Sequence, residues 1–172
     1  AAGALVSLDL NLRPMLWPAG VDPLPRLWQA LDAADLVKLA RNELDYLAVA
    51  CEGEQAALAR LLRGRAQLVV ITDGAAPIRW FSRTAQGELD SFGVRAIDTT
   101  AAGDAFVGGV LYCLARCEVS GAEFAEWLGN RSALEQVLRF GAACGAVTVT
   151  RHGAFAALPT LADLNSHLEG AP

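Results

Sequence analysis

One stretch of the sequence combines small residues with a carboxylate in a way that suits phosphate chemistry. Residues 98–109 read DTTAAGDAFVGG, and Asp104 lies in the first turn of a helix that the apolar spacing predicts from Gly103 to Arg116. Small residues let a backbone approach a ligand closely, and successive amide N–H groups at a helix start bind anions. Because a phosphate there would repel a carboxylate, Asp104 makes chemical sense as a base that takes a proton from an attacking hydroxyl. The alternative is that Asp104 only caps a glycine-rich helix start.

Alternating strands and helices must position this stretch. Apolar runs predict buried strands at 5–10, 35–40 and 68–72, and a hairpin with strands at 77–83 and 88–95. Helical spacing predicts helices over 25–34, around Leu44 with Asn42 as its cap, and over 54–63, 103–116, 122–128, 132–147 and 161–168. This order indicates an α/β fold with a doubly wound, mostly parallel sheet flanked by helices and a small hairpin.

Composition and charge exclude several classes of protein. The 172 residues are 53% hydrophobic and 19% charged, which excludes disorder and predicts one globular unit. The net charge of −5, without a basic stripe, argues against a nucleic-acid partner. No apolar run has the length of a membrane span and no leader is recognisable, so we expect no membrane partner and a cytoplasmic location. The four cysteines lack metal-site spacing and are expected to be reduced thiols without a chemical role.

The stretch at 98–109 resembles the second signature of the PfkB (ribokinase-like) carbohydrate kinases. Further segments resemble the family in the same order: 9–13 (DLNLR), Lys38, Glu43, 72–74 (TDG) and 144–159. The resemblance spans nearly the whole chain but concerns the C-terminal part of these kinases, whose sugar-binding Gly-Gly-Asn region and lid strands lie further upstream. It implies that residues 1–172 are the C-terminal part of a single ribokinase-like domain, with the N-terminal part of the fold and the lid absent.

The resemblance also implies separate roles for the backbone and the carboxylate of the signature. Ala101, Ala102 and Gly103 would supply backbone N–H groups to the transferred phosphoryl group, and Asp104 would be the catalytic base in contact with the acceptor hydroxyl. No GxxxxGK[ST] sequence is present, so the chain is not a P-loop kinase.

Cofactor contacts follow from the same resemblance. Glu43 matches the acidic end of an Asn-x-x-Glu motif that organises water around Mg²⁺, although Ala40 stands where the family has Asn. Its alternative is an exposed residue in the first turn of a helix. Thr72 and Gly74 match a strand end and turn that contact the nucleotide, ATP, with a plain strand-to-hairpin turn as the alternative.

Asp98 and Thr100 resemble residues of a loop that binds a monovalent cation, which makes K⁺ a candidate ligand. Oxygen ligands suit such a hard ion, but an aspartate that only stabilises a turn is the alternative.

The strand end at 9–13 supplies candidates for substrate binding. Asp9, Asn11 and Arg13 form a D-x-N-x-R sequence found in some family members, and we expect Asn11 and Arg13 to contact the substrate or its phosphate. An Arg that holds an Asp across a loop is the alternative. Lys38 is a candidate phosphate ligand, with a strand-end lysine that reaches solvent as its alternative.

The function that the resemblance implies is an ATP-dependent sugar kinase acting on a primary hydroxyl. Residues 9–18 and 145–160 resemble bacterial fructokinases, which favours fructose, and ribose or 2-keto-3-deoxygluconate are alternative acceptors. The alternative from another class of function is that the chain is a non-catalytic nucleotide-binding fragment or an interaction module. The expected partners are a sugar, ATP and, at full length, a second copy in a homodimer. We expect the 172-residue fragment alone to be inactive.

Overall fold

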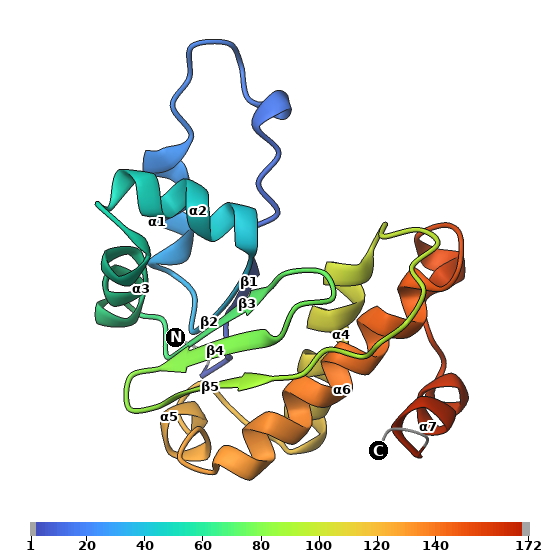
Figure 1. Ribbon diagram of the computed structural model, residues 1–172. Helices are drawn as coiled ribbons and strands as arrows, with labels where there is room; N and C mark the ends of the chain where they lie inside the picture. Colours follow the sequence, from blue (N-terminus) through green and yellow to red (C-terminus); the bar gives the residue numbers. More distant parts are fainter. Residues whose placement is uncertain (1–2, 170–172) are drawn as a thin grey trace. The chain divides into compact units, whose positions relative to one another are not determined.

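The computed structural model describes residues 3–169, which divide into two compact units (Figure 1). The first unit contains the chain up to Gly74, with Ile78–Glu88 and Ser120–Ala125. The second contains Ala75–Pro77, Leu89–Val119 and the chain from Glu126 onward.

A five-stranded sheet organises the first unit, in the order β1-β2-β3-β4-β5. The first three strands are mutually parallel, and β4 is antiparallel to β3. The strands are β1 (Ser7–Asp9), β2 (Leu36–Ala40), β3 (Leu68–Thr72), β4 (Ile78–Ser82) and β5 (Gln86–Leu89). The mostly parallel sheet with a terminal hairpin, flanked by helices, confirms the predicted α/β class.

Three helices of the first unit pack on this sheet. They are α1 (Leu24–Leu31), α2 (Arg41–Ala50) and α3 (Glu54–Arg63), and a short 3₁₀ turn, η1 (Pro14–Leu16), precedes them. Alternate residues of the central strands, such as Val37 and Val69, join the helices in one apolar core. Neighbours on the other alternation, such as Leu36 and Leu68, are equally buried. Successive side chains of a strand point to opposite faces of the sheet. Apolar residues at both sets of positions are therefore what a strand buried on both faces requires.

Several predicted boundaries are wrong: the helix expected over 25–34 ends at Leu31, and the strand expected at 5–10 covers only Ser7–Asp9. Asn42 does not cap the helix before Leu44, because α2 already begins at Arg41 and the Glu43 side chain accepts a hydrogen bond from Ala40 N at 2.7 Å. The second hairpin strand runs over Gln86–Leu89 rather than 88–95. Because the strand starts at Gln86, it includes Gly87, which packs closely against the Trp80 ring. A β-carbon at this position would come within 2.7 Å of the indole.

Two long helices dominate the second unit. They are α4 (Ala102–Arg116) and α6 (Arg131–Val149), followed by the 3₁₀ turn η2 (Phe155–Ala157) and α7 (Leu161–Glu169), while the short α5 (Phe124–Trp127) joins the units in sequence. Small residues let α4 and α6 approach closely, since a β-carbon on Gly109 would lie 2.6 Å from Cys144 Sγ. Beside this contact the rings of Tyr112 and Phe140 stack with centroids 5.7 Å apart. The position of α4 therefore depends on α6.

Gly141→Ala should destabilise the chain despite the better helix propensity of alanine. A β-carbon there would meet Phe106 O at 2.8 Å and Val110 Cγ2 at 2.7 Å, so α4 would have to move away from α6. Overpacking of this kind costs about 1–3 kcal/mol of unfolding free energy. Urea denaturation measures the loss.

Gly108→Ala is the matched control, because no heavy atom lies within 4 Å of a β-carbon at Gly108. It should gain about 0.5–1 kcal/mol through helix propensity alone. If Gly141→Ala were as stable as Gly108→Ala, the helices would not be in the close contact described.

All four cysteines carry free thiols, as expected. Cys144 is buried between α4 and α6, and this burial raises its pKa to about 11. A thiol that stays protonated at neutral pH is a poor nucleophile and metal ligand.

Candidate functional site

The 98–109 stretch forms the N-terminus of α4. Ala101 adopts a left-handed backbone with φ of 62° directly before the helix. Ala102 N donates to Thr99 O at 3.3 Å, and Ala105 N makes the first helical bond, to Ala101 O at 2.8 Å. The amides of Gly103 and Asp104 lie between these two bonds in the first turn, where N–H groups lack a partner in the helix. Gly103 and Asp104 are therefore better placed to donate to an anion than Ala102.

The loop before α4 is tied to the end of α6 and to the chain that follows it. Ile97 N and Asp98 N both donate to Val149 O, at 2.7 and 3.2 Å. The Asp98 carboxylate accepts from Thr100 N at 2.9 Å and from Gly153 N at 3.0 Å. These bonds fix the loop directly before the left-handed turn at Ala101. Asp98 thus stabilises a turn, as its alternative interpretation states, and its cation role stays a prediction.

Acid should weaken this loop selectively. Hydrogen bonds from Thr100 and from Gly153 N lower the pKa of Asp98 from 3.8 to about 2. Because the folded pKa lies below the unfolded one, the stabilisation by this carboxylate is complete above pH 3.8 and is lost as the pH falls through about 2. The difference in urea midpoint between the wild type and Asp98→Asn should therefore shrink between pH 6 and pH 2. A difference that is constant over this range would contradict the contacts described for Asp98.

The Asp104 side chain is exposed at the start of α4, and its carboxylate makes no hydrogen bond or ion pair with the described residues of the chain. A carboxylate that only capped the helix would accept a hydrogen bond from a nearby backbone N–H. The Asp104 carboxylate is instead open to an external hydroxyl. This arrangement suits a general base better than a cap.

In the first unit, candidate residues gather at the carboxyl ends of the parallel strands. The strand register places Asp9 beside Lys38 and Ala40 beside Thr72. Lys38 Nζ lies 3.2 Å from both Asp9 carboxylate oxygens, and the Lys38 residue is only 5% exposed. The alternative that Lys38 reaches solvent is therefore wrong, because its charge is neutralised inside the structure. If Lys38 also contacts phosphate, as proposed, its ammonium group must bind the phosphate and the Asp9 carboxylate at the same time.

Glu43 is buried in the first turn of α2 and is 3% exposed. Its Oε1 accepts from Leu12 N and its Oε2 from Ala40 N, both at 2.7 Å. The alternative of an exposed residue in the first turn is therefore wrong. Because two backbone donors occupy the carboxylate, any contribution to Mg²⁺ binding would have to use its remaining lone pairs, through water.

Asn11 and Arg13 lie on the exposed segment after β1. Asn11 has φ of 47°, and its Oδ1 accepts a 3.4 Å hydrogen bond from Arg13 Nη2. Arg13 Nη1 donates to Leu12 O at 3.2 Å. Lys38 Nζ pairs with Asp9 at 3.2 Å, and the alternative that Arg13 holds an Asp across a loop stays a prediction.

Thr72 ends β3, and Gly74 forms the turn that follows. Gly74 has φ of 54° with open space around it, so the turn needs glycine for its backbone conformation rather than for packing. This supports the turn that the sequence predicts. Contact of Thr72 and Gly74 with a nucleotide stays a prediction.

The predicted site residues thus fall into two groups. Asn11, Arg13, Lys38, Glu43, Thr72 and Gly74 belong to the first unit, and Asp98 to Asp104 belong to the second.

Sequence reasoning missed the residues that hold these groups in place. Gly153 supports Asp98 across 55 residues of sequence, and Leu12 supports Glu43 across 31. Both supply only a backbone N–H, which leaves no side-chain signal in a sequence. The sequence signal for this contact was the glycine at 153, since glycine is common where a turn needs a positive φ, here 93°.

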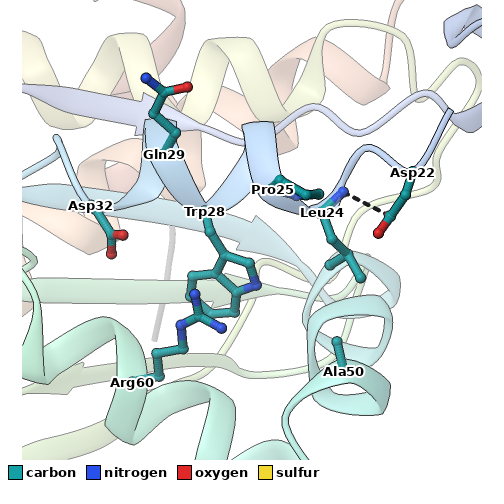
Figure 2. Close-up of a pocket in the computed structure, with 8 residues that line it drawn as sticks. All are labelled: Asp22, Leu24, Pro25, Trp28, Gln29, Asp32, Ala50 and Arg60. Carbon is teal, nitrogen blue, oxygen red and sulfur yellow. Dashed lines mark hydrogen bonds between the residues drawn. The ribbon is translucent and has the colours of Figure 1, made fainter.

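A shallow pocket elsewhere on the first unit contains none of the predicted site residues. It encloses about 560 Å³ and is lined by Asp22, Leu24, Pro25, Trp28, Gln29, Asp32, Ala50 and Arg60. Figure 2 shows the Arg60 guanidinium over the Trp28 ring, 3.6 Å from its centroid. Arg60 therefore covers the indole that would otherwise be the pocket's main apolar surface, and we give the pocket no role in catalysis.

Among residues 3–169, no three His, Cys, Asp or Glu side chains converge in a way that could hold a metal ion. Within the same range, no helix combines the length and the apolar character that a membrane crossing needs.

Comparison with known proteins assigns the chain to a family. The model of the pfkB family of carbohydrate kinases matches residues 1–161. Fructokinase-1 of Oryza sativa subsp. japonica is 35% identical over 99% of this chain and 50% of its own length. The chain spans about half the length of the curated relatives it matches.

Solved structures give the same result. Fructokinase from Xylella fastidiosa, solved with bound ATP, is 48% identical with a TM-score of 0.95, over 98% of this chain and 52% of that one. Aminoimidazole riboside kinase from Salmonella enterica is 30% identical with a TM-score of 0.79, over 98% and 54%. With the α4 signature, the parallel sheet and these matches in agreement, the chain belongs to the pfkB family of carbohydrate kinases.

Proposed function

We propose that these residues form the C-terminal half of a single-domain, ATP-dependent sugar kinase that phosphorylates a primary hydroxyl of fructose. The observation that carries the proposal is the start of α4, where the open carboxylate of Asp104 lies beside two amides that precede the first helical hydrogen bond. Family membership supplies the reaction class. At full length, we further propose, the kinase is a homodimer.

The chemistry assigns a distinct task to each group in this turn. ATP, when bound, would supply the phosphoryl group, with Mg²⁺ as a counter-charge and K⁺ as a candidate ion near Asp98. The amides of Gly103 and Asp104 are oriented to donate to phosphoryl oxygens, on which charge accumulates during transfer. The Asp104 carboxylate accepts the proton of the acceptor hydroxyl while the hydroxyl oxygen bonds to the γ-phosphorus and the bond from that phosphorus to the ADP oxygen breaks, so that ADP leaves.

Fructose is favoured because the relatives with the highest identities reported above are fructokinases. A kinase for aminoimidazole riboside matches nearly the same span of this chain, so the choice of acceptor is the finer part of the proposal. The resemblance implies that most of the residues that select among sugars lie in the half of these kinases that this chain does not span.

A panel of acceptors tests this choice. We expect the full-length kinase to show its highest kcat/KM with fructose, and lower values with ribose, 2-keto-3-deoxygluconate and aminoimidazole riboside. A higher kcat/KM with any of these three would overturn the proposal for fructose and keep the kinase class.

The 172-residue chain alone should release no ADP in response to fructose, although it contains the α4 turn. Aligning a hydroxyl with a phosphoryl group and excluding water contributes a large part of such a rate, and the family's lid belongs to the other half. A coupled assay of ADP release measures this, and calorimetry should detect at most weak ATP binding. Robust fructose phosphorylation by the chain alone would contradict the assignment of the acceptor site to the upstream half.

A non-catalytic nucleotide-binding module is the second candidate. It would bind ATP at full length and yet transfer no phosphate to any acceptor. The open carboxylate of Asp104 argues against it, because a negative charge beside a bound phosphate repels the phosphate and so weakens a site that only binds it.

A further inference from the structure

The backbone after β1 loses its sheet partner just before the residues expected to touch substrate. Leu10 N makes the last bond to the neighbouring strand, to Lys38 O at 3.2 Å. Asn11 then turns into the left-handed region with φ of 47°, and Asn11 and Arg13 are both exposed. A segment of this kind needs another anchor if its side chains are to be held in one place.

Glu43 provides that anchor. Its Oε1 accepts from Leu12 N at 2.7 Å, and its Oε2 accepts from Ala40 N at 2.7 Å, which fixes the carboxylate to the start of α2. Glu43 and Leu12 are both buried, at 3% and 8% exposure. Since water has little access there, the loss of the bond from Leu12 N would leave a buried N–H without a partner.

Arg13 depends on the same short segment. Its guanidinium donates to Leu12 O at 3.2 Å and to Asn11 Oδ1 at 3.4 Å, and so it is oriented by its immediate neighbours. Glu43 thus holds the amide of Leu12, the residue whose carbonyl accepts from Arg13. A displacement of Leu12 would move Arg13 with it.

We propose that Glu43 is a positioning residue for Arg13, which it holds in place through the backbone amide of Leu12. The role of Arg13 in binding substrate rests on the proposed function, whereas the anchor itself does not. This role is separate from any contact between Glu43 and the water around Mg²⁺. The two roles predict different results.

Amide hydrogen exchange of the 172-residue chain measures the hydrogen bond between Leu12 N and Glu43 directly and needs no assay of enzyme activity. Glu43→Gln keeps the size of the side chain, but an amide has one oxygen and one NH₂ group, so it cannot accept from both backbone donors. Glu43→Asp keeps the charge and is one methylene shorter, so it cannot span both donors either. The Leu12 amide should exchange at least about tenfold faster in both variants, because its protection reflects this local bond.

Asp45→Asn is the matched control, since Asp45 is an exposed acid on the same helix that pairs with Arg41. It should leave the exchange of the Leu12 amide unchanged, and the thermal midpoints of all variants show whether they are folded. Unchanged Leu12 exchange in folded Glu43→Gln would overturn the anchor, whatever the protein's activity.

A double-mutant cycle in the full-length kinase tests the link to Arg13. Glu43→Gln should lower kcat/KM by about 10- to 100-fold, the effect of misplacing a substrate-contacting group by about 1 Å. In the Arg13→Ala background the same change should cost at most about twofold, because the group it positions is gone.

Equal costs in both backgrounds would show that Glu43 acts independently of Arg13, as a role confined to the metal requires, and would overturn the proposal. So would an Arg13→Ala variant with wild-type kcat/KM. If the full-length protein transfers no phosphate at all, the proposed function fails, while the exchange experiment still decides whether the anchor exists.

Discussion

Asp104→Asn should abolish phosphoryl transfer while leaving ATP affinity nearly unchanged. The substitution keeps the size of the side chain and the backbone amides at the start of α4, but it removes the group that accepts the proton of the acceptor hydroxyl. Loss of a general base lowers kcat by roughly 10²- to 10⁴-fold. The measurement is kcat of the full-length kinase with fructose, together with the Kd for ATP by calorimetry.

Glu126→Gln is the control for this prediction, because Glu126 is likewise an exposed acid in the first turn of a helix, the short α5. It should retain wild-type kcat, since it adjoins no unbonded amides of the α4 turn. An Asp104→Asn variant that kept more than about a tenth of the wild-type kcat would remove Asp104 from the role of base.

Gly103→Val should lose activity even where the fold survives. Gly103 lies in the first turn of α4, and a branched side chain there would hold a phosphate away from the amides of Gly103 and Asp104. Removing donors of this kind costs about 10²- to 10³-fold in kcat. Steady-state kinetics of the full-length kinase and a thermal midpoint measure the two effects separately.

Gly108→Val supplies the comparison on the same helix. Gly108 has open space around its β-carbon position and lies beyond the first turn of α4, so this change should leave kcat within about twofold of the wild type. If Gly103→Val folds and phosphorylates sugar normally, the anion is bound elsewhere.

Local patterns predicted the elements that carry strong periodicity. The helix at 54–63 and the strand at 68–72 were predicted with the bounds that the structure gives to α3 and β3. A regular apolar face and a β-branched run leave few other conformations open to these segments. The second hairpin strand was misplaced, because its sequence alternates only weakly and its position depends on contact between Gly87 and Trp80.

The site was predictable as a set of residues but not as a set of contacts. The signature at 98–109 identified the start of α4 because glycine and alanine with one carboxylate leave a clear local pattern. The partners of Lys38 and Glu43 could not be read from the sequence. Asp9 reaches Lys38, and Leu12 reaches Glu43, only once two parallel strands have brought distant segments together.

The same contacts change how two candidates are interpreted. Both alternatives for Lys38 and Glu43 assumed exposure, since strand-end lysines and first-turn glutamates usually face water. In the structure each is buried and satisfied by a specific partner: a carboxylate for Lys38 and two backbone amides for Glu43. Burial of this kind indicates that these side chains organise the strand ends whatever else they bind.

The central claim is that the full-length protein transfers phosphate from ATP to a sugar with Asp104 as base. Phosphorus NMR of a reaction with ATP and fructose tests it directly, because the same spectrum shows ADP and any sugar phosphate. We predict that the wild type forms ADP and a fructose phosphate in equal amounts, and that Asp104→Asn forms neither within the same time. Bound ATP without any phosphorylated sugar, or ADP accompanied only by free phosphate, would contradict the claim.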